Sequence, residues 1–494
     1  MNFPGYRRLS GWIASRVGGR ASAHVAAVLA LVLALDAADL GAVGAMATYL
    51  QRDFRIDKAG LGLLAALTSG VAAAATLFFG WLVDRSKRTR MLAIVIALWG
   101  LAMLASAAAF SYGFLLISRL ALGAFTAVSI PATASLVGDF FPPERRGRMY
   151  GFILAGELIG IGFGFIVAGE LAIASWRLGF VSLAVPAFLV AWLVKRLPEP
   201  ARDGSTRIPE GRERIVPPEE ARRSGREPGG GGGDGNAEEG PETQLIHRKT
   251  REKRIEPRRH LIYDRDPAEK SLWWAVGYVL RIPTNLVLIV ASALGYYFLA
   301  GARTFGLEYV EGQYRLGHAM SVWLLMLLGA GALVGVLSGG RLGDRLLARG
   351  YLPGRVAVTV GAYLTSAVFF LAGLVWTDLW VAAPAIWLAT AALLSASPPL
   401  DAARLDIIHG HLWGRAESVR TVFRKAGTAV APLLFGYIAD AFGGGVPALR
   451  KAFLLMLIPV FASGLIALMA LRTYPRDAAT ADAYVQRTRK KAGS

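Results

Sequence analysis

Two carboxylates stand three positions apart inside a long apolar segment near the start of the chain. Asp36 and Asp39 are the acidic residues of the stretch 22–49, which is otherwise rich in alanine, leucine and valine. On a helix this spacing places both side chains on one face, and charges inside an apolar helix are unfavourable unless they serve a function. Two neighbouring carboxylates in a medium of low dielectric constant resist being charged together, so at least one should bind and release protons. A proton-coupled carrier needs this chemistry; the alternative is that both acids only satisfy polar groups between packed helices.

One cation inside an apolar segment matches these acids in depth. Arg119 lies in the segment 114–138, which runs inward from the outer face. At about 1.5 Å of rise per residue, its depth is comparable to that of Asp39. We therefore predict an Asp39–Arg119 pair across a central cavity, in which the arginine holds an anionic group or tunes the acid. The alternative is a structural salt bridge that fixes the arginine's helix.

Glu157 lies among glycines in the fifth apolar block of the chain. Gly156, Gly160 and Gly164 follow a four-residue spacing around it, and such small residues let helices approach closely. We assign this packing to the interface between the two halves of the protein. Arg424, in the eleventh block, stands at the corresponding position of the second half. We expect a polar seal at the inner mouth of the cavity, with proton carriage by Glu157 as the alternative.

The apolar blocks that carry these residues are long enough to cross a membrane. Of the 494 residues, 54% are hydrophobic and only 18% are charged. A helix needs about twenty apolar residues to cross roughly 30 Å of hydrocarbon, and a segment in lipid must satisfy its backbone within itself. The sequence therefore predicts an all-α integral membrane protein of about twelve transmembrane helices. The expected spans are 22–49, 59–83, 90–110, 114–138, 149–172, 176–196, 283–307, 318–343, 355–376, 379–402, 416–440 and 449–472.

The expected helices form two related sets of six. Three groups of residues recur in the same order in both sets, which is hard to obtain by chance. They indicate duplicated units in parallel orientation, related by a pseudo-two-fold axis along the membrane normal. The matching groups are Gly80-Leu82-Asp84-Arg85 with Gly340-Leu342-Asp344-Arg345, Pro131-Asp139-Gly147-Arg148 with Pro398-Asp406-Gly414-Arg415, and Arg177-Phe180-Pro186-Phe188 with Arg450-Phe453-Pro459-Phe461.

One loop carries a specific family resemblance. The segment Gly80–Arg90, GWLVDRSKRTR, closely resembles the loop 2–3 signature of the major facilitator superfamily, with Lys87 where the family usually has glycine. Gly340–Arg345 is a weaker copy, and the Trp176–Phe180 start of the sixth block is also similar. The resemblance implies alternating access, in which two halves rock around a central cavity lined by helices 1, 4, 7 and 10.

The resemblance also implies a latch on the cytoplasmic side. In the family, the acid of the helix-2 motif faces the positive N-terminal end of helix 11. We predict that Asp84 caps that helix end and that Arg88 bridges Asp84 and Asp139, with Gly80 and Arg85 completing the motif. A helix terminus favours an opposite charge by up to about 1 kcal/mol, and a network by more. The corresponding residues of the second half are Gly340, Asp344 and Arg345.

Within the superfamily, the first half is somewhat similar to the spinster-type lipid transporters. Asp39 stands as far before the triplet at 62–64 as the helix-1 acid of those proteins does. Leu40 replaces the arginine that usually follows that acid. Thr126 replaces a helix-4 acid, and its hydroxyl can hydrogen-bond but carries no proton. The resemblance therefore implies a distant branch, with lipid transport as one option.

The charges of the loops predict orientation and domain limits. Arginine and lysine gather in one set of alternate loops, and membrane proteins keep such loops in the cytoplasm; both termini then lie on the cytoplasmic side of a plasma (inner) membrane. Residues 1–21 are predicted to form a basic amphipathic helix on the membrane surface. Residues 201–270 are polar and predict a disordered linker between the six-helix halves 22–200 and 271–476. The second half begins with an interfacial helix, and 477–494 form a cytoplasmic tail.

These patterns predict a secondary active transporter of a small amphiphilic molecule. Proton-driven efflux by antiport is the leading hypothesis, and lipid or organic-anion transport of the same fold is the alternative. The expected partners are the small-molecule substrate, protons and membrane lipids. Anionic lipid headgroups could contact the basic segment Arg248–Arg259. The alternative is that this segment is a solvated linker. The net charge of +19 does not indicate nucleic acid, because it lies between apolar blocks. We expect a monomer.

Enzyme chemistry is the rival from another class. The sequence has no cysteine, which removes disulfides, thiolate catalysis and thiolate metal sites. His260 and Asp264 are one residue too close for a His-x4-Asp acyltransferase string. No serine-centred elbow, phosphate-binding glycine loop or cluster of metal ligands stands out. We therefore expect no enzyme activity, no cofactor and no metal.

Overall fold

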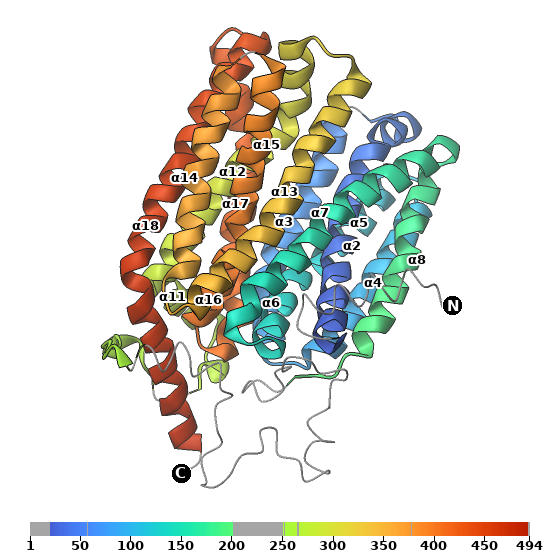
Figure 1. Cartoon of the computed structure of the whole chain (residues 1–494). Coiled ribbons are helices and arrows are strands. Elements are labelled where there is room, and N and C mark those ends of the chain that lie inside the picture. The colour runs from blue at the N-terminus through green and yellow to red at the C-terminus, as the bar shows by residue number, and fades with distance from the viewer. Residues whose placement is uncertain are drawn as a thin grey trace.

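The computed structural model describes residues 20–56, 58–200, 250, 252–263, 266–376 and 378–492. Ten helical stretches within them are long and apolar enough to cross a membrane. With α3 (Lys58–Val83) and α17 (Trp413–Ala441) they make up the twelve predicted spans. α3 has a shorter apolar stretch, and the first turns of α17 are rich in charge. Figure 1 shows these helices aligned in two neighbouring bundles, which confirms the predicted all-helical membrane fold.

The N-terminal half contains six spans, one of them broken. The fourth predicted span is two helices, because Pro131 cannot donate the backbone hydrogen bond that would continue the helix across 127–128. The elements are α2 (Arg20–Phe54), α3, α4 (Arg88–Ala107), α5 (Tyr112–Thr126), α6 (Ser129–Phe140), α7 (Pro143–Ala174) and α8 (Trp176–Lys195).

The C-terminal half repeats this plan, including the break. Pro398 and Pro399 stand in the first turn of the second piece of its fourth span, where they are tolerated but end the preceding helix. The spans are α12 (Pro283–Tyr314), α13 (His318–Ala348), α14 (Gly354–Val375), α15 (Leu379–Ser395) with α16 (Ser397–Asp406), α17 and α18 (Gly445–Ala492), preceded by the short α11 (Leu272–Arg281).

The halves meet along two symmetry-related helix pairs, α3 with α17 and α7 with α13. Glycines set both crossings. A Cβ added at Gly80 would overlap Ser418 and the carbonyl of Gly414, and one added at Gly340 would overlap the carbonyl of Gly147. All of these positions lie near one end of the bundle, the end that carries the Asp84 and Asp344 motifs. Backbone-to-backbone packing of this kind joins the two halves closely at that end.

The prediction that Gly156, Gly160 and Gly164 pack between the halves is wrong. A Cβ added at any of the three would overlap the backbone of α2, at Ala30, Ala34 and Ala38 respectively. The two rows of small residues share a four-residue spacing, so they form one continuous seam inside the N-terminal half.

The end of the predicted linker makes specific contacts with the C-terminal half. Leu261 is buried, the Arg258 guanidinium lies 2.7 Å from Asp477 of α18, and Asp266 lies 2.8 Å from the imidazole of His411. The described residues 252–263 and 266–270 therefore differ from the disorder that their composition predicted, because one apolar and several charged side chains find partners there.

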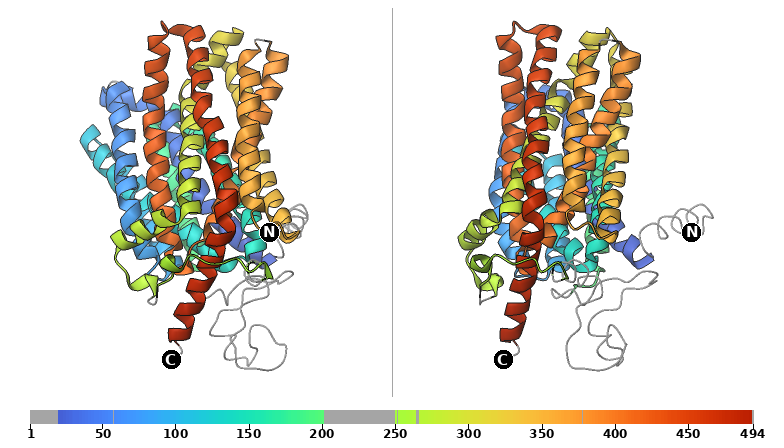
Figure 2. Two further views of the ribbon diagram at one scale, coloured as in Figure 1. Left: turned by 90° about the vertical axis from the view of Figure 1, so that its left-hand side faces the viewer. Right: turned by 60° about the vertical axis from the view of Figure 1, so that its left-hand side comes forward.

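The two ends of the chain differ from each other. α18 extends to Ala492, so most of the predicted tail continues the last helix, which Figure 2 shows projecting beyond the other helices. The predicted interfacial helix is α11, whose N-terminus is capped by the Ser271 hydroxyl accepting from the amide of Trp274. Residues 1–19 of the predicted amphipathic segment 1–21 and residues 201–249 of the predicted linker lie outside the described residues, and Arg20 and Ala21 begin α2.

Candidate functional site

The structure brings Asp39 and Arg119 together as predicted. Asp39 of α2 and Arg119 of α5 are each 4% exposed. The two terminal guanidinium nitrogens donate to the two carboxylate oxygens at 2.7 and 2.5 Å, as a bidentate fork. The Phe180 ring of α8 lies against the guanidinium at 5.7 Å. Nε of Arg119 is buried without a hydrogen-bond partner in the described structure, so the arginine keeps one unused donor.

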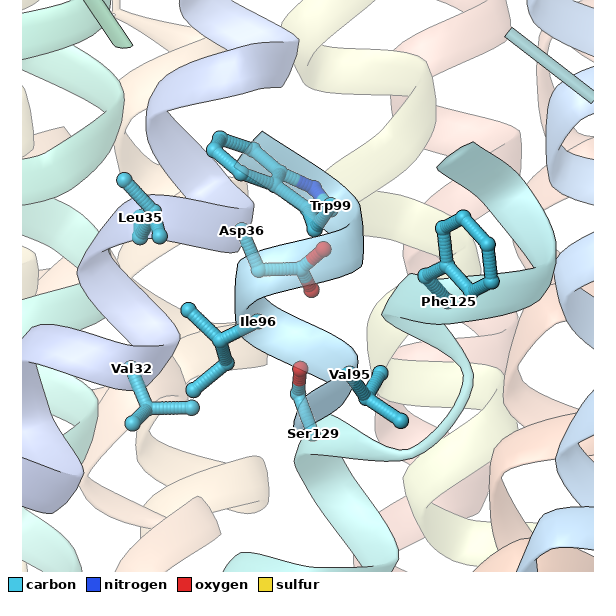
Figure 3. A pocket seen from close by; sticks show the side chains of 8 residues that line it. All are labelled: Val32, Leu35, Asp36, Val95, Ile96, Trp99, Phe125 and Ser129. Atoms are coloured by element: carbon cyan, nitrogen blue, oxygen red, sulfur yellow. The ribbon is translucent and has the colours of Figure 1, made fainter. Parts of the chain in front are cut away.

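Asp36, one turn further inward, lies apart from that pair in a small cavity. Its lining comes from α2, α4, α5 and α6 and comprises Val32, Leu35, Val95, Ile96, Trp99, Phe125 and Ser129. Figure 3 shows the carboxylate directed between α4 and the ring of Phe125. The indole N–H of Trp99, on the same wall, is buried with no acceptor among the described residues. Asp36 is thus a half-buried acid in an apolar and aromatic setting.

Cations of α17 face the acids of the first half. Lys425 and Arg424 lie within electrostatic range of Asp36, as do Asp39 and Glu157. The Arg424 guanidinium stacks on the ring of Tyr296 of α12, 4.8 Å from its centroid, and feels the charge of Glu157. The polar seal predicted for Glu157 and Arg424 stays a prediction, with the two groups within electrostatic reach.

The sequence reading missed a cluster of four charged residues in the C-terminal half, which we call the C-half cluster: Asp401 and Arg404 of α16, and Glu417 and Arg420 of α17. All four are at most 6% exposed. Nη1 of Arg420 lies 2.5 Å from Asp401 and 3.0 Å from Glu417, and Arg404 pairs with the other oxygen of Glu417. The sequence does indicate this cluster, because charged residues spaced three or four positions apart lie on one face of the eleventh expected span. The expected span 416–440 contains Glu417 and Arg420, but Arg424 is its only charged residue that the sequence singled out.

Asp84 caps a helix of the other half, as predicted. Its carboxylate accepts from the amides of Gly414 and Arg415 at 2.9 and 3.1 Å, and from Nε of Arg415 at 2.8 Å. Arg415 also donates to the carbonyls of Pro267 and Lys270, and the exposed Arg85 donates to Lys270 as well. The charge therefore meets the positive N-terminal end of α17, and the segment before α11 covers that contact.

Arg88 begins α4 and is fully buried. Its pairing with Asp139 confirms one side of the predicted bridge, whereas the side toward Asp84 stays a prediction; Arg88 also donates to Ser135 at 3.0 Å and to Glu199 at 2.9 Å. Burial alone would raise the pKa of Glu199, but the Arg88 guanidinium and hydrogen bonds from Thr89 outweigh it and lower that pKa. Glu199, which follows the end of α8, is a second acid beside Arg88 that the sequence did not predict. Lys87 has φ −70°, which any residue adopts, so the turn needs no glycine there.

The second half repeats the latch with a relay that the sequence reading did not identify. Asp344 accepts from the amides of Gly147 and Arg148 at 3.1 and 2.7 Å. Arg355, at the start of α14, donates to Asp344 at 2.8 Å and also pairs with Asp406. Arg345, which the motif pointed to, is exposed. Asp84 with Gly414 and Arg415, and Asp344 with Gly147 and Arg148, therefore join the two halves at two related points on the latch side.

Comparison with known proteins agrees with this architecture. The profile described as Major Facilitator Superfamily matches residues 29–403. The chain is similar to the fucose transporter FucP in its outward conformation, with a TM-score of 0.62 and 12% identity over 90% of this chain and 98% of that one. It is also similar to the proton:xylose symporter XylE, with a TM-score of 0.61 and 13% identity over 91% and 94%. At such identities the likeness shows the fold alone.

Curated relatives share a shorter region. The 3-(3-hydroxy-phenyl)propionate transporter of Escherichia coli (strain K12) is 32% identical over 173 residues, 35% of this chain and 43% of the relative. The niacin transporter NiaP of Acinetobacter baylyi is 28% identical over 175 residues, 39% of its length. The 4-hydroxybenzoate transporter PcaK of Pseudomonas aeruginosa is 30% identical over 175 residues, also 39% of its length. The match thus spans about two fifths of the length of these relatives. None of the three is described as a spinster-type lipid transporter. The chain belongs to the Major Facilitator Superfamily: it is an integral membrane transporter and not an enzyme.

Proposed function

We propose that this transporter carries a small aromatic carboxylate together with a proton, by alternating access of its central cavity. The observation that carries the proposal is the charge arrangement at mid-depth. One half holds the buried Asp39–Arg119 fork and Asp36, and α17 of the other half presents Arg424 and Lys425.

Fixed charges of this kind favour cotransport over exchange. A bound carboxylate adds negative charge near Lys425 and Arg424, where Asp36 and Glu157 already act. A proton taken up by an acid of the first half, with Asp39 as the principal carrier, removes negative charge that competes with the cargo. The anion and the proton therefore bind more favourably together than separately, which is a positive coupling between two ligands. This reverses the direction of the predicted antiport.

The Asp39–Arg119 fork supplies the switch. While Asp39 is ionised, its pairing with Arg119 offsets the desolvation of both groups. Once Asp39 is protonated, the pair weakens and Arg119 can turn to another acceptor. Two charge arrangements of one buried pair are a means of linking proton binding to a conformational equilibrium.

The substrate class rests on the cavity and on the relatives. Trp99 and Phe125 line the Asp36 cavity and Tyr296 lies under Arg424, so aromatic faces stand beside charges. The three relatives named above are described as transporters of hydroxyphenylpropionate, niacin and hydroxybenzoate. Both point to a flat ring bearing a carboxylate, which sharpens the predicted amphiphilic cargo. Lipid transport, implied by the spinster-type resemblance, is the second candidate.

We further propose that the latch side is cytoplasmic and that the protein lies in the plasma (inner) membrane as a monomer. The arginine-rich loops around Arg85 and Arg345 stand on the latch side, where the positive-inside rule places them. Accessibility of single cysteines to an impermeant reagent in spheroplasts tests this, because the chain has no native cysteine.

Proteoliposomes loaded at neutral pH and diluted into acidic buffer test the transport proposal. Labelled nicotinate, 4-hydroxybenzoate and 3-(3-hydroxyphenyl)propionate are compared with nicotinamide, xylose and a lysophospholipid. The proposal requires at least one carboxylate to accumulate, and its accumulation to vanish when a protonophore collapses the gradient. Accumulation of the lysophospholipid alone would favour the lipid alternative, and gradient-independent uptake would exclude proton coupling.

A further inference from the structure

Two buried arginines of the C-half cluster share one acid but are used differently. Every side-chain nitrogen of Arg404 is occupied: Nε donates to Asn285 at 3.0 Å, Nη2 donates to the carbonyl of Ala416 at 2.8 Å, and Nη1 pairs with Glu417. Arg420 uses Nη1 for both Asp401 and Glu417. Its Nε and Nη2 are buried and have no hydrogen-bond partner within the described part of the chain. Arg404 is thus a structural arginine, whereas Arg420 keeps hydrogen-bond donors that contact no acceptor in the described structure.

The unused atoms form the edge that recognises carboxylates. Nε–H and one Nη2–H of an arginine point the same way and fit the two oxygens of a carboxylate as a fork. Leaving such donors buried and unsatisfied costs about 1–3 kcal/mol, and more for a charged group. Native structures keep few groups of this kind, and each calls for an explanation. Arg420 is 2% exposed, so bulk water does not reach these donors.

Two buried hydroxyl groups, one on α17 and one on the helix that packs against it, also lack hydrogen-bond partners in the part of the chain that the structure describes. The hydroxyls of Thr421, next in sequence, and of Thr133, on the α6 helix that packs against α17, are buried without a hydrogen-bond partner among the described residues. One turn further outward, Arg424 stacks on Tyr296. Within the described ranges, buried donors from both halves therefore lie along α17 without hydrogen-bond partners, and Oδ1 of Asp401, which is close to Nη1 of Arg420, also accepts no hydrogen bond. A carboxylate would supply the two acceptors that the free edge of Arg420 lacks.

We infer that the free edge of Arg420 binds the carboxylate of the transported molecule. The inference rests on the proposed function, which calls for a carboxylate and for cations around it but names no group that holds it. The edge is covered in this conformation, in which the inner side is shut. Occupancy therefore favours a state in which the helices around Arg420 have moved, and this differential affinity lets the cargo drive the transition.

The test compares Arg420→Lys with Arg404→Lys in the purified full-length protein. Lysine keeps a positive charge beside the acids but removes the fork. The readout is the ratio of the dissociation constants of nicotinamide and nicotinate, with 4-hydroxybenzamide and 4-hydroxybenzoate as a second pair. We expect Arg420→Lys to lower this carboxylate preference at least about tenfold, since a charge-assisted bidentate contact is lost. Arg404→Lys should keep the preference despite a lower melting temperature.

An unchanged preference in Arg420→Lys would overturn the inference while leaving the proposed function in place. Absence of any carboxylate preference in the wild type would overturn both. Should Arg420→Lys not fold, Arg420→Gln combined with Asp401→Asn removes one charge of each sign and takes its place. The inference requires that double variant to lose the preference, and retention there would equally overturn it.

Discussion

The latch contacts of the two halves are close copies of each other, whereas their other buried charges differ. In the latches, Asp84 caps α17 and Asp344 accepts hydrogen bonds in the second turn of α7, each from two backbone amides of the opposite half. Outside the latches, the first half has one isolated fork, Asp39–Arg119, and the second half has the four-residue C-half cluster. Symmetry is kept where both halves join each other at the latches. It is lost where we propose that protons and cargo are handled, because each needs its own set of groups.

The helix seams of the two halves differ in the same way. α2 meets α7 through glycines and alanines, while α12 meets α17 through aromatic rings, with Phe298 and Phe305 each about 6.3 Å from Phe435. A seam of backbone contacts tolerates no added volume and moves as a unit. An aromatic seam can readjust by rotating rings.

The largest effect is expected from filling the small-residue seam. Gly160→Leu places its side chain into the backbone of α2 at Ala34, whereas Gly162→Leu, two residues later on α7, meets nothing within 4 Å. Overpacking costs about 1–3 kcal/mol or more, so Gly160→Leu should unfold at clearly lower temperature or fail to assemble. Melting of both variants in detergent checks this. Equal melting temperatures would show that the seam is not as tight as described.

The two latches should respond alike. Asp84→Asn and Asp344→Asn each remove a charge from a helix N-terminus and from an arginine, which is worth roughly 1–2 kcal/mol. Each should shift the population toward inward-facing by about tenfold. Crosslinking of a cysteine pair introduced across the outer ends of α2 and α12 should then increase. If only one variant shifts the population, the latches are not equivalent.

A smaller effect is expected from Glu199, which contacts Arg88 in the first latch. The pKa of Glu199 is lowered in the folded state, so its stabilising contribution is present above its unfolded pKa and is lost as the pH falls through the folded one. Glu199→Gln should lower stability at neutral pH by under about 1 kcal/mol and should melt with less dependence on acidic pH than the wild type. A parallel acid dependence in both proteins would show that other groups titrate.

Much of the fold followed from pattern. Apolar blocks and the repeated Gly80 and Gly340 motifs predicted the helices, the duplication and the cap at Asp84. They also predicted the Asp39–Arg119 pair, since depth along a helix follows from residue count. The partner of a small-residue seam did not follow, because periodicity shows that a face packs but not against which helix.

The second latch and the C-half cluster were missed for reasons of spacing. Arg88 follows Asp84 by four positions, but Arg355 follows Asp344 by eleven, since the loop before α14 is longer. The cluster was missed although its α17 residues lie within the expected span 416–440, because a charge inside a span does not show which helix neutralises it. Its charges are neutralised by residues of α16, which only the fold brings close.

Gradient-driven uptake by Asp39→Asn tests the central claim most directly. Nicotinate uptake into proteoliposomes is measured with an inward proton gradient and, separately, as counterflow without one, with Asp36→Asn as the matched variant one turn away. The account predicts that Asp39→Asn loses gradient-driven accumulation yet keeps counterflow, and that Asp36→Asn is milder. Full accumulation by Asp39→Asn with an unchanged pH dependence would contradict proton coupling through the Asp39–Arg119 pair.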